Sequence, residues 1–293
     1  MEKFTIVITH YNQMQYIETA IKSVLNQKYN NIELIISDDC SKDFNKKIIE
    51  SIIEKYNKKN FKYKILRNKQ NLGTVKHLNR VLDEVSGEFI LFSAADDKLY
   101  DSNVITNFVK EFSDSSKSII TSQCLLYDNA LKVKFSDYVD VNKALERNKK
   151  SSKQMYKDMC LSCLYGAGGT AYRKSVFDKY GKFNENYKYV EDWSYWVHVL
   201  RNGEKIYFSD FTTLVHRDGG ISHSEYLSDK VSKHVIGYYK DILEIYKYEI
   251  FPYFSYFTTR EKYEVLKGFN HKIWYYNQLT NNKKEYREYI KIF

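Results

Sequence analysis

The chain has 293 residues, of which 43% are hydrophobic and 28% charged, so it can bury a core as one large domain or two small ones. Its formal net charge of +9 suits nucleic acid, anionic lipid or a phosphorylated substrate, and charge alone does not choose among them. Four cysteines are too few for a disulfide scaffold, which excludes the small disulfide-rich class and favours a reducing compartment.

Two features of the sequence favour the cytoplasm. Residues 1–4 lead directly into an apolar strand pattern and do not resemble a signal peptide. The longest apolar runs fall far short of the ~20 residues that a helix needs to span a bilayer. We therefore expect a cytoplasmic protein, or one held peripherally on the inner face of the plasma membrane.

Strand and helix patterns alternate through about residue 95. Apolar runs rich in β-branched residues predict strands over 4–9, 32–37, 61–66 and 88–93. Apolar residues at helical spacing predict helices over 14–27, around 48–53 and over 74–85. This alternation predicts a parallel sheet with right-handed crossovers, as in Rossmann-like domains. The Gly-x-Gly-x-x-Gly fingerprint of dinucleotide dehydrogenases is absent.

The regular alternation ends beyond Tyr100. The pattern predicts a helix over 101–112, a strand over 117–122, a lysine-rich surface loop with some helix over 138–153, a helix over 191–202 and short strands over 205–208 and 212–216. The glycine-rich segment 166–170 either brings the backbone close to a ligand or forms a turn with tight packing. Cys160 and Cys163 have no second Cys or His pair at zinc spacing, so we expect both to be buried small residues.

From about residue 226 the pattern is helical. The periodic positions are Leu227, Val231, Val235, Tyr239, Ile242 and Tyr246. Aromatic side chains interleave with lysines in this tail, which suits contact with anionic lipid. The same residues also suit a dimer contact or a cover over the rest of the protein. The sequence leaves these alternatives open.

Two predicted strands end in paired carboxylates. Asp38 and Asp39 follow the strand over 32–37, and Asp96 and Asp97 follow the strand over 88–93. Side chains at the carboxyl ends of strands in an open α/β sheet point into the crevice where ligands bind. The sequence therefore predicts one polar site for a nucleotide and a metal ion, although aspartates at strand ends are also common turn residues.

Five stretches in this order resemble glycosyltransferases of family 2, which have the GT-A fold. They are 5–12, 37–43, 71–73, 87–97 and 191–193, and together they extend over about residues 3–225. The resemblance implies an α/β protein with a Rossmann-like, mixed but mostly parallel sheet flanked by helices, followed by a C-terminal helical extension. It also implies an inverting, nucleotide-sugar-dependent enzyme.

The resemblance also implies a division of the chain. Residues 1–100 would form the nucleotide-sugar-binding half, and residues 101–225 the acceptor-binding half of the same GT-A domain. Residues 226–293 would form the helical extension, to which the resemblance does not reach.

A set of eight residues is implied to bind the nucleotide. They are Thr9, Tyr11, Asp38, Asp39, Asn71, Gly73, Asp96 and Arg217. At the matching positions of the family an aromatic ring packs on the base and a carboxylate accepts a hydrogen bond from the uracil imide, which implies these roles for Tyr11 and Asp39 and a UDP-sugar donor. Arg217 would bind the diphosphate with two hydrogen bonds, or be a simple surface charge.

The implied metal ligands are Asp96, Asp97 and His216. The family usually supplies Asp-x-Asp, but the first of these positions is Ala94 here, which leaves open whether metal binding is weakened. Mg²⁺ and Mn²⁺ prefer oxygen ligands and accept one or two carboxylates from a protein. His216 would be a third ligand or a core histidine.

Asp192 is implied to be the general base that takes the proton of the acceptor hydroxyl. Glu191 would orient Asp192 or touch the acceptor. The alternative is that acidic residues in a first helical turn only complement the helix dipole. The Gln-x-x-Arg-Trp motif of processive synthases is missing, so we expect a non-processive hexosyltransferase that adds one sugar per encounter.

The expected partners are a nucleotide-sugar donor and a glycan or lipid-linked saccharide acceptor of surface polysaccharide synthesis. Peripheral membrane association and a homodimer fit the tail, whereas nucleic acid is not expected because there is no basic stripe. The main alternative, supported by Ala94, is a catalytically degenerate GT-A protein that acts as a binding or scaffold module. A nucleotidyltransferase would carry a glycine-rich phosphate loop after the first strand, which residues 10–13 do not form.

Overall fold

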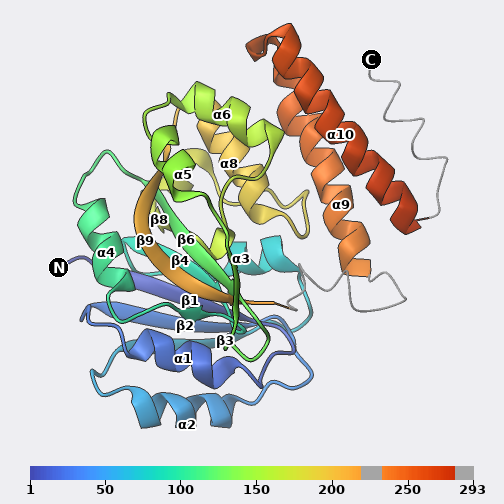
Figure 1. Ribbon diagram of the computed structural model, residues 1–293. Helices are drawn as coiled ribbons and strands as arrows, with labels where there is room; N and C mark the ends of the chain where they lie inside the picture. The colour runs from blue at the N-terminus through green and yellow to red at the C-terminus, as the bar shows by residue number, and fades with distance from the viewer. Residues whose placement is uncertain (219–232, 281–293) are drawn as a thin grey trace.

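The structure is a computed structural model that describes residues 1–218 and 233–280, and it contains a nine-stranded mixed sheet with helices on both faces. The strands lie in the order β3-β2-β1-β4-β8-β6-β9-β5, and β7 pairs with β6 beside this path. A helical hairpin follows the sheet domain, as Figure 1 shows. The predicted α/β fold with a mostly parallel first half is confirmed.

The first half of the chain forms the parallel part of the sheet. Its strands are β1 (Phe4–His10), β2 (Ile32–Asp38), β3 (Lys62–Arg67) and β4 (Phe89–Ala94). The helices between them are α1 (Ile17–Leu25), α2 (Lys46–Tyr56) and α3 (Thr74–Leu82). All seven elements overlap the predicted ones, so the alternation in the sequence was a reliable guide to this half.

The two faces of the sheet carry separate apolar clusters. Ile6 and Ile8 of β1 pack with α1, α2 and α4 (Val104–Phe112), whereas Val7 packs on the opposite face with α3. Successive side chains of a strand point to opposite faces, which explains why an unbroken apolar run fills both clusters.

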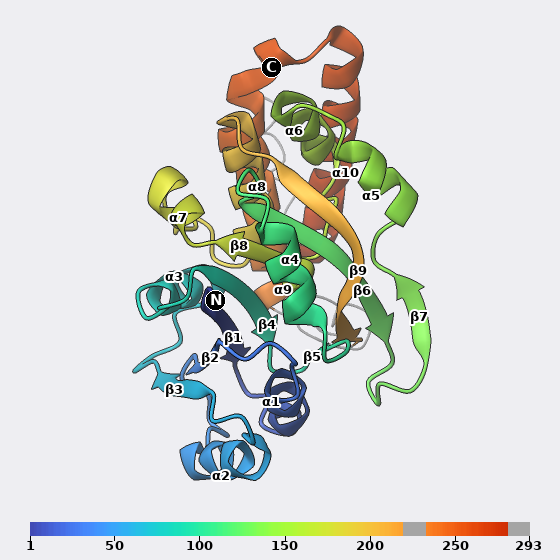
Figure 2. The same cartoon turned by 90° about the vertical axis from the view of Figure 1, so that its left-hand side faces the viewer.

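The second half adds shorter, mixed strands. They are β5 (Lys98–Leu99), β6 (Ile119–Tyr127), β7 (Lys134–Asp137), β8 (Thr170–Arg173) and β9 (Ile206–Arg217). β8 is antiparallel to both β4 and β6, and β6 is parallel to β9. Figure 2 shows β7 beside β6 at the margin of the molecule. The sequence pattern predicts neither β7 nor β8, since β7 is exposed at all four positions and β8 follows directly on the glycine-rich segment.

The predicted strands over 205–208 and 212–216 are one strand. In β9 the pairing with β6 shifts around Gln123, so that Ser122 faces Ser209 and Gln123 faces Thr212. Asp210 is exposed at this irregularity, and a polar exposed residue inside an apolar run made the strand look broken.

The predicted surface loop over 138–153 is more ordered than expected. It contains α5 (Val141–Arg147) and the start of α6 (Ser152–Leu161). The side chain of Asp140 caps α5, and Ser151 with Gln154 forms a capping box at α6. The capping residues account for helices in a segment of low hydrophobicity. Two helices complete this half, α7 (Ser175–Tyr180) and α8 (Glu191–Arg201).

The extension consists of α9 (Lys233–Ile245), a π-helical turn (Tyr246–Ile250), a 3₁₀ segment (Phe251–Tyr256) and α10 (Thr259–Thr280). Its apolar side chains belong to the same core cluster as α3, α6 and α8, so the hairpin covers the domain. This was one of the alternatives for the aromatic tail. Leu227 and Val231 lie outside the described residues, as does the predicted boundary at residue 226.

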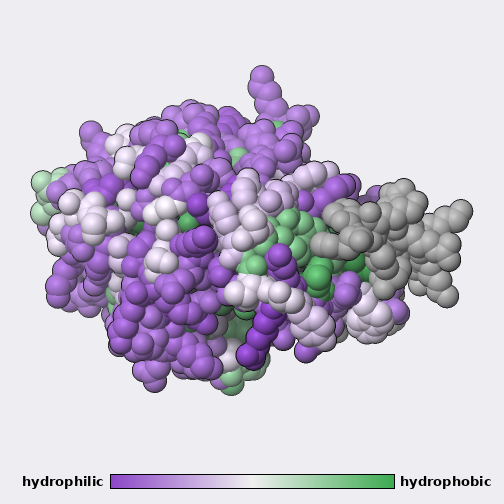
Figure 3. All heavy atoms as spheres, turned by 90° about the horizontal axis from the view of Figure 1, so that it is seen from above, coloured by the Kyte–Doolittle hydropathy of each residue, from purple (hydrophilic) through white to green (hydrophobic). Residues whose placement is uncertain are grey.

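None of the helices in residues 1–218 and 233–280 combines the length and apolar character that crossing a bilayer requires. The face in Figure 3 is mostly hydrophilic, with apolar side chains gathered in a band towards the right of the view.

Candidate active site

A cavity of about 740 Å³ lies at the carboxyl ends of β1, β2 and β4. The register of the sheet brings these ends together, because Thr9 pairs with Ser37 on one side and with Ala94 on the other. The predicted site residues that line the cavity are Thr9, Tyr11, Asp39, Asn71, Gly73, Asp96, Asp97, Glu191, Asp192 and His216. Asp38 and Arg217 do not line it.

Asp39 shapes the wall of the cavity at β2. Its Oδ1 accepts hydrogen bonds from the side-chain amide of Asn68 (2.7 Å) and the backbone N–H of Leu72 (2.8 Å), and its Oδ2 accepts the N–H of Gly73 (2.9 Å). Gly73 has a φ of +78°, a conformation that favours glycine, and it begins α3. Asp39 therefore fixes the turn before α3 while its Oδ2 has capacity for a further donor.

Asp38 has a structural role outside the cavity lining, and its contact with the nucleotide stays a prediction. It is 0% exposed, its Oδ1 lies 2.8 Å from Nδ1 of His10, and its Oδ2 lies 3.2 Å from Nε of Arg67. Burial raises the pKa of Asp38, but the hydrogen bonds from His10 and Ser41 lower it overall. The ionised carboxylate therefore ties β1, β2 and the following turn together.

Arg217 also lies outside the cavity lining. It is 7% exposed, its Nε donates to the backbone oxygen of Asp96 (3.1 Å), and its guanidinium lies 4.2 Å from the ring centroid of Tyr16. A second nitrogen of the guanidinium donates to the backbone oxygen of Asn129. These contacts direct the side chain towards the support of Asp96 and away from the cavity.

Asp97 and His216 form an ion pair at one end of the cavity. His216 Nδ1 and Asp97 Oδ1 are 2.9 Å apart, and Asp97 Oδ1 also accepts the N–H of Arg217 (3.3 Å). Burial alone would lower the pKa of His216, but the charge and hydrogen bond of Asp97 raise it overall. Burial and the charge of Asp97 raise the pKa of Asp96 to about 6.

The carboxylates of Asp96 and Asp97 have oxygen atoms, which hard divalent ions prefer as ligands. Within residues 1–218 and 233–280 no three His, Cys, Asp or Glu side chains gather closely enough to form a complete metal centre. Mg²⁺ and Mn²⁺ usually take one or two carboxylates, and phosphate and water oxygens fill the other positions. Asp96 and Asp97 are two carboxylates of this kind in the cavity wall, near His216, whereas Ala94 lines the cavity without a ligand atom in its side chain.

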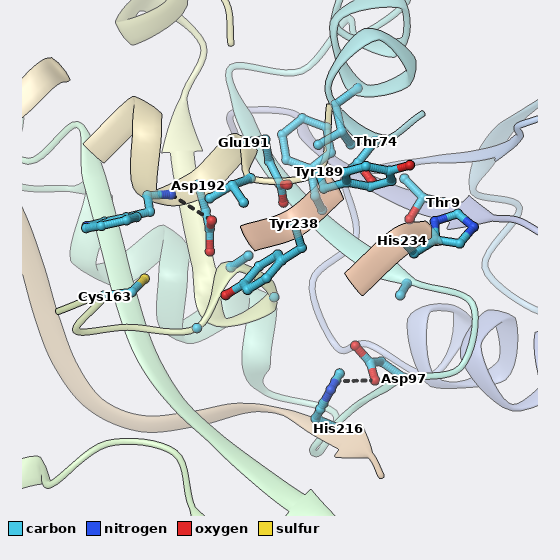
Figure 4. A pocket seen from close by; sticks show the side chains of 18 of the residues that line it. Thr9, Thr74, Asp97, Cys163, Tyr189, Glu191, Asp192, His216, His234 and Tyr238 are labelled. Carbon is cyan, nitrogen blue, oxygen red and sulfur yellow. Dashed lines mark hydrogen bonds and ion pairs between the residues drawn. The ribbon is translucent and has the colours of Figure 1, made fainter. Parts of the chain in front are cut away.

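Glu191 and Asp192 lie in another part of the cavity, in the first turn of α8 (Figure 4). Burial, and then the charge of Asp192, raise the pKa of Glu191 to about 8. Burial raises the pKa of Asp192 to about 6, against the hydrogen bond that its Oδ1 accepts from the N–H of Trp193 (2.6 Å). Burial and the neighbouring charge thus favour the protonated form of Glu191 more strongly than that of Asp192.

The cavity contains residues that the sequence analysis did not assign to the site. They include Gln13, His77, Tyr138, Cys163, Tyr189, His234, Tyr238 and Lys272. Tyr138 is 49% and Tyr238 is 39% exposed, and Figure 4 shows Tyr238 beside Asp192. Helical spacing marked the region of His234 and Tyr238 as a packed helix, but gave no signal for the partner of that helix.

Cysteine and glycine residues of the segment before β8 also line the cavity. Cys160 is buried as predicted, but Cys163 is exposed and lines the cavity, so the prediction of two buried cysteines is wrong for Cys163. Gly166 and Gly168 line the cavity, whereas a Cβ on Gly169 would lie 2.6 Å from Cys124 Sγ and 2.8 Å from Ser122 O. The glycine-rich segment therefore serves both purposes considered from the sequence, approach to the cavity and tight packing.

The mixed sheet and the carboxylates that line the cavity at its strand ends agree with the GT-A fold. A sequence model of glycosyl transferase family 2 matches residues 5–181, and the chain belongs to that family.

The relatives of the chain include enzymes of glycan synthesis. A GalNAc(5)-diNAcBac-PP-undecaprenol β-1,3-glucosyltransferase of Campylobacter jejuni is 26% identical over 247 residues, which cover 84% of this chain and 74% of the relative. Among solved structures, Staphylococcus aureus TarS residues 1–349 in complex with UDP-GlcNAc superposes with a TM-score of 0.58 at 18% identity, covering 94% of this chain and 83% of that one.

A second solved structure shares the fold at lower identity. The mannosyltransferase PcManGT of Pyrobaculum calidifontis, in complex with GDP-Man and Mn²⁺, has a TM-score of 0.59 at 13% identity. The match covers 84% of this chain and 63% of that one.

Proposed function

We propose that the protein transfers a hexosyl group from a nucleotide-sugar, in the first place a UDP-sugar, to a hydroxyl of a glycan or lipid-linked saccharide, with inversion at the anomeric carbon. One observation carries the proposal: Asp39, the Asp96–Asp97 pair and Asp192 come from three distant segments and line one cavity. Its volume of about 740 Å³ is in the range of small-molecule sites.

The nucleoside would bind at the ends of β1 and β2. Thr9 and Tyr11 line this wall, and Oδ2 of Asp39 has one protein donor, so it can accept a further hydrogen bond from a base N–H. Three hydrogen bonds already fix the carboxylate of Asp39, which makes it a preorganised acceptor. One fold neighbour was solved with a UDP-sugar and another with a GDP-sugar. The choice of UDP over GDP as the donor nucleotide is therefore part of the proposal.

The diphosphate would lie beside Asp96 and Asp97. These carboxylates, with His216, would hold Mn²⁺ or Mg²⁺, which when bound neutralises the charge that develops on the leaving diphosphate. Arg217 keeps the backbone of Asp96 in place, and the pairing of Asp97 with His216 sets the orientation of that carboxylate.

The acceptor would enter beside Asp192. As the acceptor oxygen forms its bond to the anomeric carbon and the bond to the diphosphate breaks, the ionised Asp192 takes the hydroxyl proton. The protonated Glu191 can donate a hydrogen bond to an acceptor oxygen. Attack from the side of Asp192, away from the leaving diphosphate, inverts the anomeric centre.

The aromatic side chains of this region suit a saccharide acceptor. Tyr138, Tyr189 and Tyr238 line the cavity and offer apolar ring faces with polar hydroxyl groups. The undecaprenol-linked acceptor in the name of the Campylobacter relative favours a lipid-linked glycan of bacterial surface synthesis. Such an acceptor would bring the protein to a membrane surface, so peripheral association is part of the proposal.

Ala94 favours a second candidate, a binding module that retains the nucleotide site without turnover. The missing third carboxylate is its only support among the described residues, since Glu191 and Asp192 are both in the cavity. Turnover of any nucleotide-sugar that is lost in Asp192→Asn would reject the binding module.

Calorimetric titration with UDP and GDP, with and without Mn²⁺, tests the proposed donor site. We expect UDP to bind more tightly with Mn²⁺, and Asp39→Asn to weaken UDP binding because an amide presents one acceptor fewer. Failure of both nucleotides to bind in the presence of Mn²⁺ would reject the proposal.

A further inference from the structure

The carboxylate of Asp241, on helix α9 of the extension, accepts three backbone hydrogen bonds. Its Oδ2 accepts the N–H groups of Lys188 (2.8 Å), Tyr189 (2.6 Å) and Val190 (3.3 Å). Asp241 is 5% exposed, so these contacts are shielded from water. Glu191 follows directly, and the side chain of Val190, the residue at the N-cap of α8, makes no capping hydrogen bond. The extension thus anchors the three residues that lead into α8, of which Val190 is the N-cap.

Two further residues of α9 contact the same segment. The ring of Tyr189 makes an edge contact with His234, with centroids 5.4 Å apart. A Cβ on Gly237 would come 2.1 Å from the Tyr189 ring, so the helix approaches closely because this position has no side chain. Gly237 and Asp241 are four residues apart and therefore lie on one face of α9.

Residues 188–190 lie between the cavity wall that contains Asp39 and the acidic pair at the start of α8. The backbone oxygen of Lys188 accepts the N–H of Val75 (3.4 Å) at the start of α3, next to Gly73, whose N–H donates to Asp39. On its other side the segment continues into Glu191 and Asp192. Its backbone position therefore determines where the acidic pair lies relative to the nucleotide wall.

An acid at position 241 is electrostatically costly, which argues against a role in packing alone. Burial raises the pKa of Asp241, and among the causes that raise the pKa of Glu191 the charge of Asp241 follows burial and the charge of Asp192. A carboxylate oxygen is nevertheless a strong acceptor that can serve three N–H groups together.

We propose that Asp241 is a positioning residue: it fixes the backbone of residues 188–190 and so places Asp192 against the acceptor hydroxyl, which makes the extension a working part of the active site. This inference rests on the proposed function, because it takes Asp192 as the base. It assigns the C-terminal helices a role that the sequence comparison did not suggest.

The test compares Asp241→Ala and Asp241→Asn with a matched control, Glu249→Ala. Glu249 is a partly buried acid of the extension and also contacts α8, but at the far end of that helix, where its Oε2 lies 3.0 Å from Arg201. The readouts are kcat and KM for hydrolysis of UDP- and GDP-sugars with Mn²⁺, UDP affinity, and Tm. Should Asp241→Ala not fold, Asp241→Ser replaces it, since its short hydroxyl cannot reach all three N–H groups.

We expect Asp241→Ala to lower kcat by about 10- to 100-fold, because a displaced base loses its alignment, with KM and UDP affinity within about twofold of the wild type. Asp241→Asn should recover most of kcat, since its amide oxygen can accept the same N–H groups. Glu249→Ala should lower Tm while kcat stays within about twofold of the wild type.

A wild-type kcat in Asp241→Ala, with only Tm reduced, would overturn the inference and leave the proposed function standing. A loss of kcat in Glu249→Ala as large as in Asp241→Ala would also overturn it, because general docking of the extension would then explain both. A wild-type protein that hydrolyses no nucleotide-sugar would reject the proposed function, and the positioning role would fall with it.

Discussion

At the scale of single residues, adjacent acids of this protein lie in different surroundings. Asp38 is fully buried and paired with His10 and Arg67, while Asp39 lines the cavity. Glu191 and Asp192 share the cavity, but burial and its neighbour's charge raise the pKa of Glu191 further. Surroundings thus separate the roles of acids that stand side by side in the sequence.

The raised pKa of Asp192 predicts the acid limb of the pH profile. Because the base must be ionised, kcat for donor hydrolysis should rise about tenfold per pH unit below about 6 and level off above it. An aspartate with an ordinary pKa of about 3.9 would give a flat profile over the same range. Rates at saturating Mn²⁺ and donor, from pH 4.5 to 7.5, would measure this.

Glu191→Gln is the control for that profile. It removes the other acid of the pair, and the rise near pH 6 should remain if Asp192 is the titrating base. A profile that is flat from pH 4.5 upward in the wild type would contradict the assignment of Asp192.

The predicted site residues that follow the strands β2 and β4 meet at one cavity. Asp39, Asp96 and Asp97 come directly after buried strands, and the sheet register brings them together. Asp38 and Arg217 do not line the cavity, because neighbouring residues point in different directions. Their partners, among them His10 and Tyr16, come from other segments. Such partners become visible only in three dimensions.

At the scale of elements, the glycine-rich segment before β8 allows the backbone to cross close to β6. The added carbon of Gly169→Ala would lie 2.8 Å from the backbone oxygen of Ser122, which cannot move aside as a flexible side chain could. We predict that Gly169→Ala lowers the free energy of unfolding by about 1–3 kcal/mol through overpacking. Urea denaturation of the variant and the wild type would measure this.

Gly166→Ala is a matched control for that prediction. Its added carbon would have ordinary contacts of 3.4 Å or more with Cys124 and Tyr138, so unfolding should change by less than about 0.5 kcal/mol. Equal destabilisation by both substitutions would contradict the packing explanation for Gly169.

Helical periodicity predicted α9 as an element but not its place in the molecule. The apolar positions Val235, Ile242 and Tyr246 indicated a buried face, and the structure buries all three. Gly237 and Asp241 lie on roughly the opposite side of α9, and the apolar spacing gave no signal for their contacts with residues 188–190. Spacing identifies a face, whereas its partner is set by tertiary packing.

At the scale of the whole molecule, three parts of the chain meet at one cavity. The parallel half supplies Asp39 and Asp97, the mixed half supplies Asp192 and His216, and α9 supplies Tyr238. The sequence could predict the first two contributions because family motifs mark them. The third comes from the extension, to which the resemblance does not reach.

The proposed metal site predicts that loss of a metal ligand weakens the binding of UDP in the presence of Mn²⁺. Asp97→Asn should weaken UDP binding in Mn²⁺ by at least about tenfold, or about 1.4 kcal/mol, because a carboxylate beside His216 is lost. Asp101→Asn removes an exposed aspartate and should bind UDP as the wild type does. Calorimetry in Mn²⁺ and in EDTA would measure both variants, and UDP affinity in Asp97→Asn equal to that of the wild type in Mn²⁺ would contradict the site.

The combined measurement of UDP affinity and nucleotide-sugar hydrolysis in Asp192→Asn tests the central claim most directly. The two side chains have nearly the same shape, so we predict UDP affinity within about twofold of the wild type and turnover lower by about 10²- to 10⁴-fold. Turnover within about threefold of the wild type, at unchanged UDP affinity, would contradict the assignment of Asp192 as the base of this active site.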